Sequence, residues 1–447
     1  MNKVISTAIS CTLLIPLLAA CSSSSTTSTD KAPAETAADL NKVDNEPVTL
    51  TFKSDFPDDM DVFNQYYGDR IKQKFPNVTI NFIPRTTGQT LQDLLNAGTY
   101  PDIMYGKTNG VDGFIIETGL AYDMSELVKK YNYDLSRFKP QLIDAIRNTN
   151  PDGQLFGLPM PDFDPQVLYY NKSIFDRFGV PYPKDGMTWD EVYDLAQKLT
   201  RVDGGKVYRG FSMQQGVIMR DNQLGIPYLD PKADKMYNDE AWKKQFENLA
   251  RFYQITNNNR DTKNRSAGVE SDAFIKGDVA MQVNQLTKFR TFPEGLEWDM
   301  VTIPTFKEKP NTMNQSSSAY WFITNTNKNK DISFKIIAYL LSDEVQTDYA
   351  TNLAGLPSIK AMDKAVKTFG QNVPALKGKH VEAAYKYDLA PASPQRDKGL
   401  VKADPNKVAS AINNAFLKVV IDGVDINTAL RQAGEDITKA IDEKRTK

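Results

Sequence analysis

The sequence predicts an α/β protein of two units, because an alternation of strands and helices runs along the chain and then restarts. Apolar runs at residues 48–53 and 77–83 predict strands, and the spacing of apolar residues over 59–75 predicts a helix between them. A short helix over 90–97 and a strand over 101–105 complete a βαβαβ order. This order is typical of a parallel sheet with helices on both faces, which binds ligands at the carboxyl ends of its strands.

The second alternation begins after Gly153. Its clearest local signal is a capping box at Thr188 and Glu191, which predicts the start of a helix that reaches Leu199. Two α/β units with returning crossovers fit this restart better than one continuous sheet. Further strands are predicted over residues 167–170, 207–213, 280–283, 300–303 and 321–324, and further helices over 239–255, 331–349, 405–421 and 427–443.

The composition excludes several kinds of site. The 447 residues include 54 Lys and Arg against 56 Asp and Glu, so the charge predicts no nucleic-acid partner. His380 is the only histidine, which argues against His-rich metal sites and a Ser-His-Asp triad. The chain has no P-loop and no HExxH motif. We therefore expect no metal and no cofactor, and we interpret the acids of residues 55–61 as an acidic first helical turn rather than as a calcium site.

The first 20 residues predict a secretion signal. Lys3 precedes an apolar stretch over 4–18, which is shorter than the roughly twenty residues that a membrane-spanning helix needs. Small residues before Cys21 resemble a bacterial lipobox, which implies cleavage before Cys21 and a lipid on its thiol. The alternatives are an ordinary secretion signal with a chance cysteine, or an uncleaved anchor. Residues 21–45 are rich in Ser, Thr and Ala and predict a flexible tether.

Several segments carry a family resemblance in a fixed order. They are AGTYPDI at 97–103, GLAYDM at 119–124, DGQLFGLP at 152–159, LYYNK at 168–172 with TWDE at 188–191, FIKGDVAM at 274–281 and PTF at 304–306. Together they resemble the family 1 extracellular solute-binding proteins, the family of maltose-binding protein, which are receptors of bacterial ATP-binding-cassette (ABC) carbohydrate importers. The resemblance covers nearly all of residues 48–447.

This resemblance implies a two-lobed, type II periplasmic-binding-protein-like fold with a ligand cleft between lobes that hinge strands join. Residues 46–162 and 320–370 would form lobe 1, and residues 163–319 and 371–447 would form lobe 2. It also implies a monomer without catalytic residues that captures a carbohydrate, most simply an oligosaccharide, and delivers it to the importer's permease. The location would be the extracytoplasmic face of the cell membrane, with a lipid anchor, and Ser22 after the lipid-bearing Cys21 favours a Gram-positive surface.

The candidate ligand contacts lie at predicted strand ends and lobe crossings, where acids, amides and aromatic rings can pair with or stack on a sugar. The interpretation of the acids as turn caps and of the aromatic residues as core stays open. The candidates are Asp55, Lys107, Asn109, Asp162, Asp164, Gln214, Asn284, Tyr320 and Trp321.

One departure from the family pattern bears on specificity. Relatives continue the strand at 280–283 into Asn-Gly-x-Trp, whereas this chain keeps Asn284 and lacks the Gly and the stacking Trp. Maltodextrin specificity is therefore not implied. Arg396 could recognise a uronate carboxylate, but we interpret it as a surface residue.

Two other functions compete with a sugar receptor. A cell-surface glycoside hydrolase would need a pair of carboxylates, for which Asp162 and Asp164 would serve. A receptor for another solute, such as a peptide, a polyamine or a phosphate ester, would keep the same fold. The near-neutral charge and the aromatic residues at the expected rim favour a sugar.

Overall fold

The computed structural model describes residues 39–446 apart from 41, 43–45, 108–113, 162, 261, 264, 317 and 361. Cys21, Asn109 and Asp162 lie outside the described residues. Residues 38–447 form one compact unit. No helix in the described ranges combines the length and the apolar character that a bilayer crossing requires.

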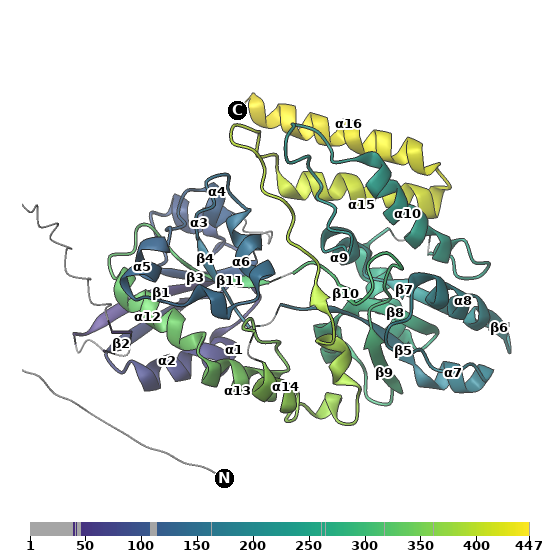
Figure 1. Ribbon diagram of the computed structural model, residues 1–447, viewed down its shortest axis with the longest axis horizontal. Helices are drawn as coiled ribbons and strands as arrows, with labels where there is room; N and C mark the ends of the chain where they lie inside the picture. Colours follow the sequence, from purple (N-terminus) through teal and green to yellow (C-terminus); the bar gives the residue numbers. More distant parts are fainter. Residues whose placement is uncertain are drawn as a thin grey trace, which may run out of the picture. The chain divides into compact units, whose positions relative to one another are not determined.

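Two five-stranded sheets organise this unit (Figure 1). The first sheet has the order β2-β1-β3-β11-β4, and the second has the order β6-β7-β8-β5-β9. Each sheet lies in its own hydrophobic core, and we name the two bodies lobe 1 and lobe 2 after them. The strands of lobe 1 are β1 (Val48–Ser54), β2 (Val78–Ile83), β3 (Ile103–Lys107), β4 (Gly157–Pro159) and β11 (Ala319–Ile323). The strands of lobe 2 are β5 (Gln166–Asn171), β6 (Arg201–Asp203), β7 (Lys206–Met213), β8 (Val279–Gln285) and β9 (Trp298–Thr302).

The register of lobe 1 confirms the predicted βαβαβ order. Strands β2, β1 and β3 are parallel, so the carboxyl ends of β1 and β3 meet at one edge of the sheet. Strand β11 enters from much later in the chain and pairs antiparallel with both β3 and β4. In lobe 2 the parallel pair is β7 and β8, and β5 runs antiparallel between β8 and β9.

Helices surround both sheets (Figure 1). Those on the lobe 1 side of the chain are α1 (Met60–Phe63), η1 (Asn64–Gly68), α2 (Asp69–Lys74), α3 (Leu91–Asn96), α4 (Phe114–Glu117), α5 (Ser125–Lys130), η2 (Leu135–Arg137), α6 (Pro140–Arg147), α12 (Lys330–Leu340) and α13 (Asp343–Leu353). Those on the lobe 2 side are α7 (Lys172–Phe178), α8 (Trp189–Leu199), α9 (Gln215–Arg220), α10 (Asp239–Tyr253), α11 (Ala267–Ala273), η3 (Phe274–Lys276), η4 (Leu286–Thr291), α14 (Asp363–Lys367), η5 (Pro374–Leu376), η6 (Val381–Ala384), α15 (Pro405–Asp422) and α16 (Ile426–Arg445).

One sequence expectation about these elements was wrong. The helix predicted over 331–349 is two helices, α12 and α13, because Ser342 caps a new N-terminus by accepting a hydrogen bond from the Val345 N–H. Gly157 lies in β4, where an added Cβ would stand 2.9 Å from the Cβ of Tyr320 on the neighbouring strand. The capping box at Thr188 is confirmed, with both reciprocal bonds present.

The lobes are connected by segments that are bonded to one another. The first crossing runs from β4 to β5, and the second runs from β10 (Thr312–Met313) to β11. The Met160 N–H donates to Ala319 O at 2.9 Å and the Gln166 N–H donates to Asn314 Oδ1 at 2.8 Å, which joins the two crossings. Strand β12 (Asp388–Leu389) pairs with β10 and begins a segment that continues to α15. The crossings therefore form one bonded layer between the lobes.

Candidate functional site

A cavity of about 250 Å³ lies beside the crossings, and both lobes line it. Its floor includes Met160 and Pro161 of the first crossing and Ala319 at the start of β11. A larger groove of about 790 Å³ runs along α16, but it lies within lobe 2 and far from the strand ends. The lobe-spanning cavity is the candidate site, and its lining residues are Phe56, Pro57, Asp58, Tyr66, Tyr67, Lys107, Met160, Pro161, Asp164, Thr287, Arg290, Ala319 and Tyr349.

Lobe 1 contributes an aromatic wall. Tyr66 and Tyr67 lie in η1, a π-helical turn between α1 and α2, and such turns occur frequently at functional sites. The ring centroid of Tyr349, from α13, lies 6.0 Å from that of Tyr66 and 6.5 Å from that of Tyr67, with the rings of Tyr67 and Tyr349 nearly parallel. Phe56 extends this wall beyond the end of β1. The wall offers aromatic faces and edges of the kind that pack on the C–H patches of a sugar ring.

Asp58 is the acid that lobe 1 presents to the cavity. Its Oδ2 accepts hydrogen bonds from the Tyr105 hydroxyl at 2.8 Å and from Ser54 Oγ at 3.1 Å. Burial raises the pKa of Tyr105 well above its usual value and the charge of Asp58 raises it further, so the phenol stays a donor. Asp58 Oδ1 has no hydrogen-bond partner among the described residues. The two hydrogen bonds to Oδ2 thus fix the orientation of this carboxylate, while Oδ1 is available to a ligand.

Asp55, the expected contact after β1, does not line the cavity. Its backbone N–H donates to Tyr105 O at 2.9 Å, and the residue is buried. Its side chain packs against Gly106 of β3, where an added Cβ would lie 2.4 Å from Asp55 Cβ. The absence of a side chain at Gly106 therefore lets the ends of β1 and β3 approach, which places Lys107 on the cavity.

Lobe 2 contributes Asp164, Thr287 and Arg290. Asp164 was an expected contact, and it lies in the first crossing with each carboxylate oxygen already bonded. Oδ1 accepts from the Thr287 N–H at 3.0 Å, and Oδ2 accepts from Thr287 Oγ1 at 2.7 Å. Asp164 therefore joins the crossing to the first turn of η4 and presents its remaining lone pairs to the cavity.

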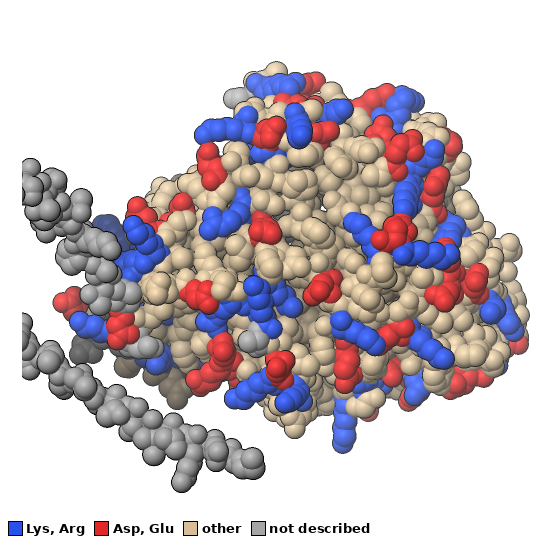
Figure 2. All heavy atoms as spheres, in the orientation of Figure 1, with Lys and Arg blue, Asp and Glu red and all other residues tan. Residues whose placement is uncertain are grey.

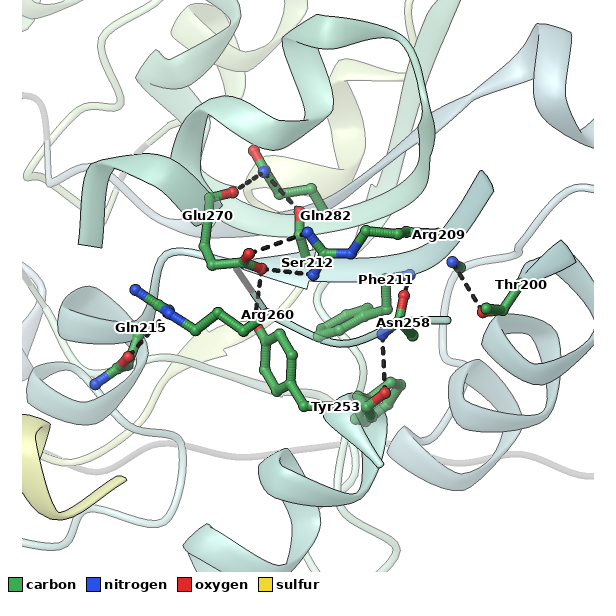
Figure 3. Close-up of polar contacts among 12 residues, drawn as sticks. Thr200, Arg209, Phe211, Ser212, Gln215, Tyr253, Asn258, Arg260, Glu270 and Gln282 are labelled. Carbon is green, nitrogen blue, oxygen red and sulfur yellow. Dashed lines mark hydrogen bonds and ion pairs between the residues drawn. The ribbon is translucent and has the colours of Figure 1, made fainter. Parts of the chain in front are cut away.

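Asn284 is part of the packing of lobe 2 rather than of the cavity lining. Its Nδ2 donates to Ser271 Oγ at 3.2 Å and to Gln282 Oε1 at 3.0 Å. Gln282 Nε2 in turn donates to Glu270 O at 2.9 Å, inside a buried polar network (Figure 3). At the centre of this network the fully buried Glu270 accepts two bonds from Arg209, at 3.0 and 2.9 Å, which hold α11 against β7.

Three other expected contacts do not line the cavity either. Tyr320 and Trp321 were expected as stacking surfaces, but β11 is a central strand and both side chains are buried in the lobe 1 core. The Tyr320 hydroxyl donates to Leu142 O at 2.7 Å, and the Trp321 ring packs behind Tyr67 at a centroid distance of 4.9 Å. Gln214 lies at the end of β7 and begins α9. Arg396, interpreted as a surface residue, pairs with Asp234 at 2.9 Å outside the cavity.

Sequence reasoning therefore missed part of the lining. Tyr66 and Tyr67 were placed in the helix predicted over residues 59–75, and Asp58 was assigned to an acidic helical turn. Tyr349 lay inside a helix predicted to be continuous, and Thr287 stands in the segment where the family's Trp is absent. Only Phe56 carried a usable signal, because it directly follows the first strand.

The cavity offers binding groups. Carboxylate acceptors, two cationic side chains and aromatic faces surround a small space between bodies that share bonded crossings. Among the described residues, no group of three His, Cys, Asp or Glu side chains is placed to hold a metal ion. Such an arrangement can hold a small polar solute between two lobes.

Comparison with known families agrees. The bacterial extracellular solute-binding protein family matches residues 53–347, which is more than half of the chain. The chain belongs to this family.

Among curated proteins, the similarities cover parts of the chain. The sn-glycerol-3-phosphate-binding periplasmic protein UgpB of Brucella abortus (strain 2308) is 31% identical over 83 residues, which span 18% of this chain and 18% of that relative. An uncharacterized ABC transporter extracellular-binding protein, PH1214 of Pyrococcus horikoshii, is 22% identical over 263 residues, or 53% of this chain and 56% of that relative.

Experimental structures of other proteins share the fold over almost the whole chain. The sugar-binding protein MalE from Xanthomonas citri matches with a TM-score of 0.69 and 18% identity over 89% of this chain and 98% of that one. The ABC substrate-binding protein Lmo0181 from Listeria monocytogenes, in complex with cycloalternan, matches with a TM-score of 0.66 and 20% identity over 89% of this chain and 100% of that one. These likenesses confirm the two-lobed α/β fold.

A matched pair of substitutions tests the close approach at the cavity edge. Gly106→Ala should destabilise the protein by about 1–3 kcal/mol, because its Cβ would overlap Asp55 and force the ends of β1 and β3 apart. Gly434→Ala, in the α16 helix with nothing within 4 Å of the new Cβ, should stabilise it by about 0.5–1 kcal/mol. Urea unfolding measures both. Equal stability of Gly106→Ala and the parent would contradict the described contact.

Proposed function

We propose that the protein is a receptor for a carbohydrate, most simply an oligosaccharide, which binds in the lobe-spanning cavity. The observation that carries this proposal is the combination of the aromatic wall with Asp58 and Asp164 in one cavity. The aromatic side chains would pack on the apolar patches of a sugar, and the carboxylates would accept bonds from its hydroxyls. Two proteins with the same fold have oligosaccharides bound, cycloalternan in one and mannotriose in the other, which supports the choice of ligand class.

The surface charge supports a ligand without strong charge. On the face drawn in Figure 2, basic and acidic side chains are interspersed and neither sign dominates. Such a surface produces no strong field that would steer a highly charged solute. Within the cavity, Asp58 and Asp164 offset Lys107 and Arg290 in formal charge.

A phosphate ester is the second candidate ligand. Lys107 and Arg290 both line the cavity, and paired cations of this kind recognise phosphate oxygens. Curated relatives matched over short segments are named as sn-glycerol-3-phosphate-binding proteins. We rank this candidate second because two carboxylates share the same small space and would repel a dianion.

We further propose that the receptor is a monomer that delivers its ligand to an ABC permease and is held at the extracytoplasmic membrane surface, with a Gram-positive setting, by a lipid on Cys21. In this proposal residues 1–20 are the cleaved signal and residues 21–45 are the tether. The proposed lobe bounds are residues 46–162 with 320–370, and 163–319 with 371–447. Ile359 packs with the lobe 1 core whereas Met362 and Ala365 pack with the lobe 2 core, which favours moving the last crossing toward residue 360.

A ligand panel tests the proposed function. Binding to the folded state alone adds RT ln(1 + [L]/Kd) to its stability, or about 2.7 kcal/mol at a hundredfold excess over Kd. We expect the melting temperature to rise with at least one neutral oligosaccharide, without any breakdown of that sugar on long incubation. A rise with sn-glycerol-3-phosphate alone would select the phosphate ester, and a rise with peptides alone would overturn both the carbohydrate and the phosphate ester. Cleavage products would indicate a hydrolase.

The two acids should behave differently when each is neutralised. Asp58→Asn keeps an acceptor for Tyr105 and Ser54 but removes the charged oxygen that faces the cavity, so the affinity for the bound sugar should fall about tenfold, the cost of roughly 1.5 kcal/mol for a hydrogen bond to a charged group. Asp164→Asn cannot accept with both of its side-chain atoms from Thr287, so it should also lower the stability of the unliganded protein. Calorimetry and thermal melting separate these effects.

Asp61→Asn is the control for both variants, because Asp61 is an exposed acid in the first turn of the helix that follows Asp58. It should change neither affinity nor stability. An unchanged affinity in both Asp58→Asn and Asp164→Asn would remove the two acids from the ligand site.

The lipid anchor has its own test. Cys21→Ser should release the protein from the membrane fraction of the producing bacterium into the medium with an unchanged melting temperature, because only the acylated thiol is lost. Cys11→Ser is the matched control and should leave the protein in the membrane fraction. A Cys21→Ser protein that stays membrane-bound would overturn the lipoprotein proposal.

A further inference from the structure

Arg290 links lobe 2 to the last helix of lobe 1 at the rim of the cavity. It belongs to η4, whose Leu286 and Phe289 pack in the lobe 2 core. Its Nη2 donates to the carbonyl oxygen of Leu353 at 2.8 Å, and Leu353 packs against the lobe 1 core as the last residue of α13. One guanidinium therefore lines the cavity and at the same time joins the two lobes.

The end of α13 is well suited to accept this bond. The last carbonyl groups of a helix have no intrahelical partner, and the negative end of the helix dipole lies there. An arginine at this end donates to an unpaired carbonyl and also places a positive charge at the negative end of the dipole. Its planar guanidinium is rigid, so little side-chain entropy is lost when the bond forms. The contact is therefore favourable despite the exposure of Arg290.

The chain changes direction directly after this contact. Ala354 has a φ of +52°, a left-handed conformation that is disfavoured for residues with a side chain. At the next residue, Gly355, an added Cβ would lie 2.0 Å from the ring of Tyr349. Ala354 itself is buried in the lobe 2 core. The chain then returns to lobe 1, where the Lys139 N–H donates to Ser358 O at 2.9 Å and Ile359 packs in the core. Residues 353–355 thus form a turn between the two cores, and their conformation depends on Tyr349, which lines the cavity.

We propose that Arg290 is a latch between the lobes, which restrains their movement and connects that movement to the state of the cavity. The η4 turn of Arg290 packs with one core and Leu353 packs with the other, so a movement that separates the lobes at this rim must break the bond between them. A ligand whose acceptor atom binds the Arg290 guanidinium competes with the Leu353 carbonyl for it. Occupancy of the cavity then changes the restraint between the lobes, which is the differential contact that a ligand-driven movement requires.

The latch can be tested without any ligand, so its failure is distinguishable from failure of the proposed function. Beyond Cys11 and Cys21 the chain has no cysteine, so with both changed to Ser two introduced cysteines accept spin labels. Gln73→Cys on α2 and Asp194→Cys on α8 place one exposed label on each lobe. Electron–electron double resonance then measures the distribution of distances between the lobes in the full chain.

We expect Arg290→Gln to broaden this distribution and to raise the population of the minor lobe arrangement by about tenfold, the effect of losing one hydrogen bond to a charged group. Lys288→Gln is the matched control, because Lys288 lies in the same η4 turn and pairs with Asp272 at 2.7 Å within lobe 2. It should leave the distribution unchanged. Equal distributions in Arg290→Gln and the parent, with both proteins folded by circular dichroism, would overturn the latch, as would an equal broadening in Lys288→Gln.

Discussion

The architecture depends on one strand that arrives late. Strand β11 occupies the position between β3 and β4 in the sheet of lobe 1, although it follows all five strands of lobe 2 in the chain. Lobe 1 cannot complete its sheet until the chain has returned from lobe 2, so the sheet of lobe 2 is in effect an insertion into the sheet of lobe 1, and α15 and α16 join lobe 2 afterwards. This order forces the two crossings to lie side by side, as the bond from Met160 to Ala319 shows. Contacts of such long sequence separation are costly to close, so lobe 1 should be the slower part to fold.

The cavity follows from this arrangement. Ends of β1, β3 and β11 open at the same edge of the sheet, and the first crossing leaves β4 beside them. The groups on the two sides of the cavity are held differently. Asp58 is held by side chains of its own lobe, whereas Asp164 is held by Thr287 in the first turn of η4. The position of the Asp164 carboxylate therefore depends on the position of that turn. A ligand can therefore contact both acids only when lobe 1, the first crossing and η4 have one particular arrangement. A receptor that closes on its solute needs contacts of this kind.

The sequence predicted the periodic parts of the fold well and the cavity poorly, for a physical reason. Strands and helices follow from local signals, such as the alternation of apolar residues or the helix cap at Thr188, and these can be recognised in the sequence. The lining depends on which side of an element faces the crossing, and a fully buried central strand carries no alternation to reveal it. Trp321 was for this reason expected at the ligand and lies in the core. Tyr66 and Tyr67 share helical spacing with core residues, and only the π-helical turn directs them toward Tyr349.

Tyr349 shows why recognition and movement are difficult to separate in this protein. Its ring belongs to the aromatic wall, packs against Gly355 in the turn after α13, and lies one helical turn before the carbonyl that Arg290 binds. A change of the wall that widened the cavity would also remove the surface on which residues 353–355 are packed. Interiors are close-packed, so such a change is transmitted to neighbouring groups rather than absorbed. Specificity in this chain is therefore more freely altered from Phe56 and Asp58, which line the cavity from the segment that follows β1.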